Sequence, residues 1–155
     1  MTVTMPGPAS VDIPVPVPVP DSHRDLLVRP VYGVLSTMMS DGQPQSSLVW
    51  VDYDGTCVLI NTALERQKCR NVATNPRVAL LVVDPDNTGR WLEVRGEVVE
   101  LTPHGAVEHA DTLTRRYTGK QHFYGDVYRP ERQQQETRVI MRIRPVKVSL
   151  DAIFK

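Results

Sequence analysis

The feature that most constrains this fold is a succession of short β-patterned segments with few helical patterns between them. Runs of apolar and β-branched residues alternate with turns rich in Gly, Pro, Asp and Asn. Because regular helices do not separate the strands, a doubly wound α/β sheet is disfavoured, and six or seven mostly antiparallel strands predict a mainly β barrel with a few helices. The expected strands are residues 31–39, 45–53, 56–62, 78–83, 91–101 and 138–144, with a further strand at 146–150 after the break at Pro145.

The turns between these segments predict how the first strands connect. Residues 40–44 and the pair Asp54 and Gly55 have typical turn chemistry, so the first three strands are expected to form an antiparallel meander. Helical periodicity is expected over residues 64–74 and from Thr102 and Pro103 to Gly119. A short capped helix is expected within residues 21–28. Gly96, inside a strand, indicates a bulge or a close backbone approach.

The first 20 residues differ from the rest of the chain. Residues 13–20 alternate Pro with Ile or Val, a pattern that blocks helix and sheet ladder and favours polyproline II. We therefore expect a flexible Pro-rich leader over residues 1–20 and a single folded domain over residues 21–155. An arm laid over a partner subunit, or a ligand for a proline-binding domain, stays open as an alternative.

Charge and cysteine content exclude several classes. Lys plus Arg number 18 and Asp plus Glu number 18, so a general nucleic-acid binder, which normally has a basic excess, is not expected. No apolar run has the length of a membrane span. Cys57 and Cys69 lack metal spacing, and the four histidines show none either, so reduced thiols, no metal and a cytoplasmic location are expected. Each histidine is expected at the surface.

The most informative stretch begins at Asn61 and Thr62, where a strand ends and a helix carrying Arg66, Lys68 and Arg70 follows. Amide groups at a helix start favour an anion, and cations placed there oppose the helix dipole unless an anion accompanies them. The pattern indicates a phosphate site. A solvated basic helix face remains the alternative reading of the spacing.

Other chemistry is sparse. Trp91 lies on a strand with Glu93 and Arg95 on one side, where it either stacks on a ring system or is buried in the barrel. The chain contains no GxSxG, P-loop or GxGxxG motif, and Ser46 and Ser47 have no nearby histidine. No catalytic residue is assigned.

An ordered set of segments resembles the pyridoxamine 5′-phosphate oxidase-like, or flavin/deazaflavin split β-barrel, superfamily. These segments are YGVLST at 32–37, DGQPQSS at 41–47, RQKCRNV at 66–72, NPRVA at 75–79 and LEVRGEV at 92–98. The resemblance covers roughly residues 23–150. It implies an FMN-binding split-barrel type of fold and a homodimer with two cofactors at the subunit interface.

The resemblance also implies roles for residues. Arg66 and Lys68 would hold the cofactor phosphate, with Asn61 and Thr62 beside it and Trp91 approaching from the facing strand region. The strand with Gln45, Ser47, Leu48 and Val49 would run along the isoalloxazine-type ring, although Leu48 stands where relatives often have a polar side chain.

The short chain and its 92–96 strand are similar to the branch that uses coenzyme F420, a deazaflavin. The C-terminus lacks the arginine-containing motif of true pyridoxamine phosphate oxidases, so vitamin B6 oxidation is not expected. The resemblance therefore implies hydride transfer from reduced F420 to a small conjugated organic acceptor. The alternatives are an FMN-dependent oxidoreductase and a non-catalytic cofactor- or haem-binding protein. Residues between Gly119 and Arg138, including Phe123, Tyr124 and Tyr128, are expected to line the acceptor site or to pack on the barrel.

Overall fold

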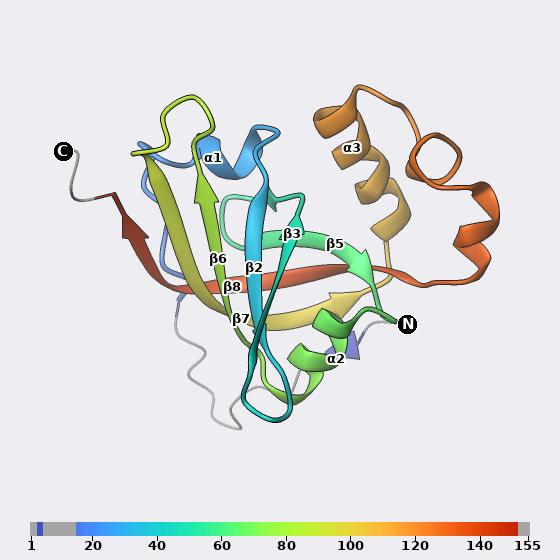
Figure 1. The fold of residues 1–155 in the computed structure, drawn as a ribbon, viewed down its shortest axis with the longest axis horizontal. Helices are drawn as coiled ribbons and strands as arrows, with labels where there is room; N and C mark the ends of the chain where they lie inside the picture. Colours follow the sequence, from blue (N-terminus) through green and yellow to red (C-terminus); the bar gives the residue numbers. More distant parts are fainter. Residues whose placement is uncertain (1–2, 5–14, 152–155) are drawn as a thin grey trace.

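The computed structural model describes residues 3–4 and 15–151, and within them the chain forms a strongly curled antiparallel sheet (Figure 1). The strand order is β3-β2-β6-β7-β8-β5-β4, and β1 pairs with β7. This arrangement confirms the mainly β split barrel. The strands are β1 (Val3–Thr4), β2 (Gly33–Met38), β3 (Pro44–Val49), β4 (Asp52–Tyr53), β5 (Val58–Ala63), β6 (Arg77–Val83), β7 (Trp91–Thr102) and β8 (Arg138–Leu150).

Three α-helices and two short helical turns accompany the sheet. They are α1 (Asp25–Val28), α2 (Gln67–Thr74), α3 (Ala106–Thr118), η1 (Phe123–Val127) and η2 (Pro130–Gln134). Helix α3 packs against β5 and β8, so β5 is buried along almost its whole length, whereas β2 alternates buried and half-buried residues. Leu35, Ile60, Leu80 and Met141 are among the fully buried side chains of the barrel interior. No helix of the described residues is both long and apolar enough to cross a membrane.

The predicted meander is wrong at its second strand. The segment 45–53 is split into β3, which pairs with β2, and β4, which pairs with β5 at the opposite end of the strand order. The break falls at Trp50 and Val51, where the Val51 amide donates to the Tyr117 hydroxyl at 2.9 Å instead of to a strand. Tyr117 lies on α3, 66 residues away, so the sequence pattern of the strand carries no sign of this break. The hairpin predicted at Asp54 and Gly55 is confirmed, because it joins β4 to β5.

The predicted strand break at Pro145 is also wrong. Strand β8 continues from Arg138 to Leu150, and a register shift against β7 falls beside the pair Gly96 and Pro145. The register shift accommodates Pro145, which has no backbone N–H group to donate to the neighbouring strand. At Gly96 a Cβ atom would lie 2.5 Å from the carbonyl oxygen of Arg144, which confirms the close backbone approach.

The N-terminal boundary of helix α3 lies later than predicted. Thr102 does not cap the helix. Its hydroxyl accepts a hydrogen bond from the His104 amide at 3.2 Å, in the turn that precedes the helix. The helix begins at Ala106, after Gly105 with a left-handed φ of 73°. It ends as expected at Gly119, which also has a positive φ of 76°.

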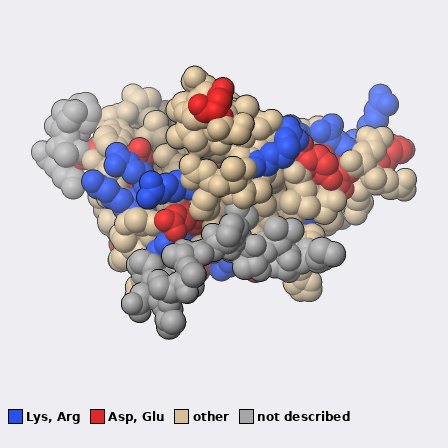
Figure 2. Space-filling view, turned by 90° about the horizontal axis from the view of Figure 1, so that it is seen from below, with Lys and Arg blue, Asp and Glu red and all other residues tan. Residues whose placement is uncertain are grey.

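The end of the Pro-rich leader packs on the barrel. Val19 is buried, and the amide of Val17 donates to the carbonyl of Pro145 at 3.0 Å. Residues 1–2 and 5–14 of the leader lie outside the described residues, and the division of the chain after residue 20 stays a prediction. Seen from below, Lys and Arg side chains lie on both the left and the right of the molecule with acidic groups near them, and no charge of one sign covers this face (Figure 2).

Candidate cofactor-binding pocket

The start of α2 presents the predicted basic residues at one end of a pocket. Strand β5 ends at Ala63, and the helix begins at Gln67 after Arg66, whose backbone is extended and whose side chain makes no capping bond. Helices leave their first amide groups without intrahelical acceptors, and the positive end of the dipole lies there. The local chain therefore brings amides and cations to the same point.

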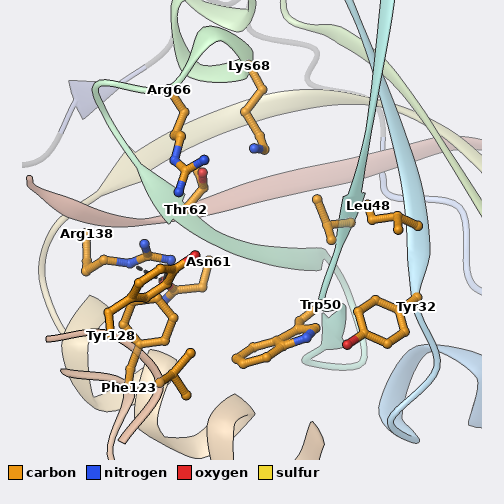
Figure 3. Close-up of a pocket in the computed structure, with 12 residues that line it drawn as sticks. Tyr32, Leu48, Trp50, Asn61, Thr62, Arg66, Lys68, Phe123, Tyr128 and Arg138 are labelled. Carbon is orange, nitrogen blue, oxygen red and sulfur yellow. Dashed lines mark hydrogen bonds between the residues drawn. The ribbon is translucent and has the colours of Figure 1, made fainter. Parts of the chain in front are cut away.

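The pocket is an open hollow of about 280 Å³ between β3, β5, the start of α2 and the η1 segment (Figure 3). It brings together six of the nine predicted cofactor-binding residues. Its lining consists of Tyr32, Leu48, Val49, Trp50, Asn61, Thr62, Arg66, Lys68, Phe123, Val127, Tyr128 and Arg138. Their role in binding a cofactor stays a prediction.

Arg66 and Lys68 point into the pocket from the same side (Figure 3). Among the described residues, no hydrogen bond or ion pair engages either side chain. Lys68 is half-buried, and its burial together with the guanidinium groups of Arg66 and Arg138 lowers its pKa. A cation held among cations in a partly desolvated site is stabilised by an anion. The geometry therefore favours an anionic group at this end.

Asn61 lies at the pocket, but its amide is fully engaged within the protein. Its Oδ1 accepts from Nε and Nη2 of Arg138 at 2.9 and 2.7 Å. Its Nδ2 donates to the carbonyl of Ala106 at 2.7 Å and to His109 at 3.1 Å. Asn61 thus contacts a further pocket cation, which sequence reasoning missed. Residues 138–144 interleave arginines with apolar residues, but only the β5–β8 pairing places Arg138 at the pocket.

The opposite end of the pocket is aromatic. Trp50 stacks on Tyr117 with ring centroids 5.2 Å apart and an angle of 12° between the planes. Phe123 meets Trp50 edge to face at 6.3 Å, and Tyr128 packs on Phe123 at 5.1 Å. Tyr32, 55% exposed, stands at the rim. The segment between Gly119 and Arg138 therefore supplies part of the pocket wall, as expected for Phe123 and Tyr128.

Three predicted residues lie outside this lining. Gln45 is half-buried and accepts a hydrogen bond from Asn71 of α2 at 3.1 Å. Ser47 stands opposite Leu35 on the neighbouring strand. Trp91 opens β7, where its amide donates to Asp151 at 3.2 Å. Within one chain these three are not brought to the pocket, and their contacts with a cofactor stay predictions.

Two of the histidines expected at the surface are not exposed there: His23 is buried and His109 is partly buried. His23 is 6% exposed and meets Asp151 at 2.5 Å, and His109 lies between Asn61 and Asp52. Cys69, in α2, is also buried, and burial raises the pKa of its thiol to about 11. The thiol stays protonated at neutral pH, so it is not a nucleophile. No group of three or more metal-ligating side chains occurs in the described part of the chain.

The curled sheet defines a split β-barrel protein, and its pocket is cationic at one end and aromatic at the other. A family model described as pyridoxamine 5′-phosphate oxidase matches residues 19–150. The chain belongs to this family.

Solved structures give the same fold. A protein titled "F420 Reductase" is 38% identical, with a TM-score of 0.72, and the match covers 84% of this chain and 98% of that one. A conserved hypothetical protein from Mycobacterium tuberculosis is 26% identical, with a TM-score of 0.63 over 85% of this chain and 84% of that one. HupZ of Group A Streptococcus is 16% identical, with a TM-score of 0.60 over 85% and 93%, and shows the fold alone.

Proposed function

We propose that the protein is an F420-dependent oxidoreductase that transfers hydride from the reduced deazaflavin to a small conjugated organic acceptor. The observation that carries the proposal is a pair of cations, Arg66 and Lys68, that have no partner in the described part of the chain and lie in a pocket with an aromatic wall. The 38% identity to a protein titled as an F420 reductase supports the choice of deazaflavin.

The residues present fit such a cofactor. Arg66 and Lys68 would hold its phosphate by charge-assisted hydrogen bonds. Leu48 and Val49 would lie along the ring, with Ser47 and backbone amides of β3 at its edge. When bound, the reduced deazaflavin supplies the hydride, and solvent supplies the proton. The chain's own work is to bind, orient and shield the reacting ring, and Trp50, Phe123 and Tyr128 would exclude water from one side.

A homodimer with the cofactor at the interface is part of this proposal. Leu48, Val34 and Leu81 are aligned across β3, β2 and β6, and Leu48 and Leu81 are 70% and 41% exposed. Val83, 38% exposed, pairs with Trp91 at the end of the same sheet face. The pocket of one chain, about 280 Å³, is at the lower limit of the roughly 300–1,000 Å³ of small-molecule sites. A second copy covering this face would bury the apolar side chains and enlarge the site.

The test is a comparison of ligands on the purified protein. Oxidised F420 and FMN are titrated by fluorescence, and reduced F420 is then mixed with a panel of conjugated acceptors while deazaflavin absorbance is followed. We expect F420 to bind more tightly than FMN and to be reoxidised by at least one acceptor. Tighter binding of FMN supports the FMN-dependent alternative. Binding of F420 without reoxidation by any acceptor supports the non-catalytic alternative. A monomer by light scattering contradicts the dimer.

A further inference from the structure

Arg138 is held in one orientation at the pocket. Its side chain is 8% exposed, and its guanidinium carbon lies 4.3 Å from the centre of the Phe123 ring. Nε and Nη2 donate to Asn61, and Nη1 donates to Glu136 at 3.2 Å. A guanidinium has five N–H groups, so one on each terminal nitrogen remains for a ligand.

The orientation of the Asn61 amide fixes that of Arg138. Its Nδ2 hydrogens are used by the carbonyl of Ala106 and by Nδ1 of His109. A flipped amide would turn its NH₂ group against the guanidinium and its oxygen against the Ala106 carbonyl. The amide can therefore present its oxygen to Arg138 only while His109 accepts a hydrogen bond.

His109 meets this requirement in one tautomer. Its Nε2 lies 3.0 Å from Oδ2 of Asp52, and the other oxygen of Asp52 accepts from Arg116 at 3.0 Å. Burial alone would raise the pKa of Asp52, but the hydrogen bonds from His109 and Arg116 hold it at about 2. An ionised Asp52 accepts a hydrogen bond from the Nε2–H group of His109, so the unprotonated Nδ1 is the acceptor for Asn61.

We propose that Arg138 is a third anion-binding residue of the pocket, and that Asn61 and His109 are positioning residues that aim its guanidinium at the bound anion. This inference rests on the proposed function, because the anion would be the phosphate of the nucleotide cofactor. Its basis is the chain of contacts from Asp52 through His109 and Asn61 to a pocket-lining arginine.

The charge balance of the pocket favours a ligand-binding role over a simple brace between β5 and β8. Arg66, Lys68 and Arg138 line the pocket, and within residues 3–4 and 15–151 only Arg138 has an acidic partner, Glu136. Glu136 is shared, because it also accepts from Arg132 and from the Tyr124 hydroxyl. Glu136 therefore offsets the charge of Arg138 only in part, and the pocket keeps a net positive charge that an anion would balance.

The test uses ligand pairs that differ only in the phosphate-bearing chain: F420 against the deazaflavin alcohol that ends at its ribityl group, and FMN against riboflavin. His109→Leu removes the acceptor, whereas His109→Gln keeps an acceptor and a donor in one side chain. His104→Leu, at an exposed position just before α3, is the matched control. We expect H109L to weaken nucleotide binding by about tenfold and to bind the phosphate-free ligand about as tightly as the wild type does. The H109Q and H104L variants should bind both ligands about as tightly as the wild type.

Rescue by the conservative variant gives a readout that a structural brace would not move. The groups that face His109 are Asp52 on β4, with Arg116 of α3 behind it, and Asn61 on β5, with Arg138 of β8 behind it. The Gln side chain can accept a hydrogen bond from Asn61 and donate one to Asp52. H109Q should therefore keep the preference for the phosphate-bearing ligand that H109L loses.

The inference is overturned if H109L weakens both members of a ligand pair equally, or neither of them. Arg138→Gln repeats the test should H109L fold poorly, and the same selective loss is expected. A wild-type protein that binds neither nucleotide contradicts the proposed function instead. In that case the variants are compared by the rise in melting temperature that inorganic phosphate produces, which H109L and R138Q should lose if Arg138 binds an anion.

Discussion

The two ends of the pocket are built in different ways. Most of the cationic end comes from one stretch of chain, in which Thr62, Arg66 and Lys68 follow each other from β5 into α2, and strand β8 adds Arg138. The aromatic end combines Tyr32, Trp50, Phe123 and Tyr128, which come from three separate segments and meet only in the folded barrel. The anion-binding start of a helix forms from residues close together in the sequence, whereas the ring-binding wall forms only when distant segments pack together. The two ends should therefore respond differently to substitution.

The largest expected effect is at the cationic end. Lys68→Ala should weaken F420 binding by about 1.5–3 kcal/mol, the range of a hydrogen bond to a charged group. Fluorescence titration measures the change, and the phosphate-free deazaflavin should lose little. Arg70→Ala is the matched control, because Arg70 lies on the same helix but is exposed and bonded to Glu65 and Gln67. Equal losses in the two variants would contradict the phosphate assignment.

At the aromatic end we expect a smaller loss of affinity, and one that does not depend on the phosphate. Trp50→Leu removes the ring stacked on Tyr117, and aromatic pairs contribute about 0.5–1.5 kcal/mol beyond area burial. Here F420 and its phosphate-free form should weaken alike. Trp91→Leu, measured beside it, decides whether Trp91 approaches the ring as predicted: a matching loss supports that role, and no change removes it.

The network behind the pocket should appear in the acid stability of the protein. Since the folded-state pKa of Asp52 is about 2 against an ordinary 3.8, its contribution is present above the unfolded pKa and is lost as pH falls toward 2. We expect a loss of about 1–2 kcal/mol after solvent screening. Urea unfolding at pH 5 and pH 2.5 measures it, and Asp52→Asn should show a shallower decline over that interval. If the unfolding free energy of Asp52→Asn declines as steeply as that of the wild type, Asp52 does not contribute to the acid stability.

The smallest effect concerns the charge of Lys68. Its pKa is lowered by burial and by the neighbouring guanidinium groups, and an anion binds only its protonated form. Affinity for F420 should therefore decline as pH rises through the alkaline range, by a few-fold. Lys68→Arg, whose guanidinium keeps its proton, should be flat over the same titration. A wild-type profile that is equally flat would mean that the Lys68 charge does not contact the ligand.

The contrast between the two ends also explains what could be predicted from sequence. The helix start with Arg66 and Lys68 and the hairpin at Asp54 and Gly55 are local patterns, and the structure has both. Arg138, Trp50 and His109 reach their places through strand pairing and the docking of α3, which no local pattern encodes. For the same reason the break in the second strand was missed: it depends on Tyr117, far along the chain.

The central claim is that the pocket binds a phosphate at one end and a ring at the other. The most direct test is a crystal structure of the protein with F420. We expect the phosphate in contact with Arg66, Lys68 and Arg138, and the deazaflavin ring along Leu48 and Val49 toward Trp50. A phosphate bound away from the start of α2, or a ring lying outside the pocket, would contradict it.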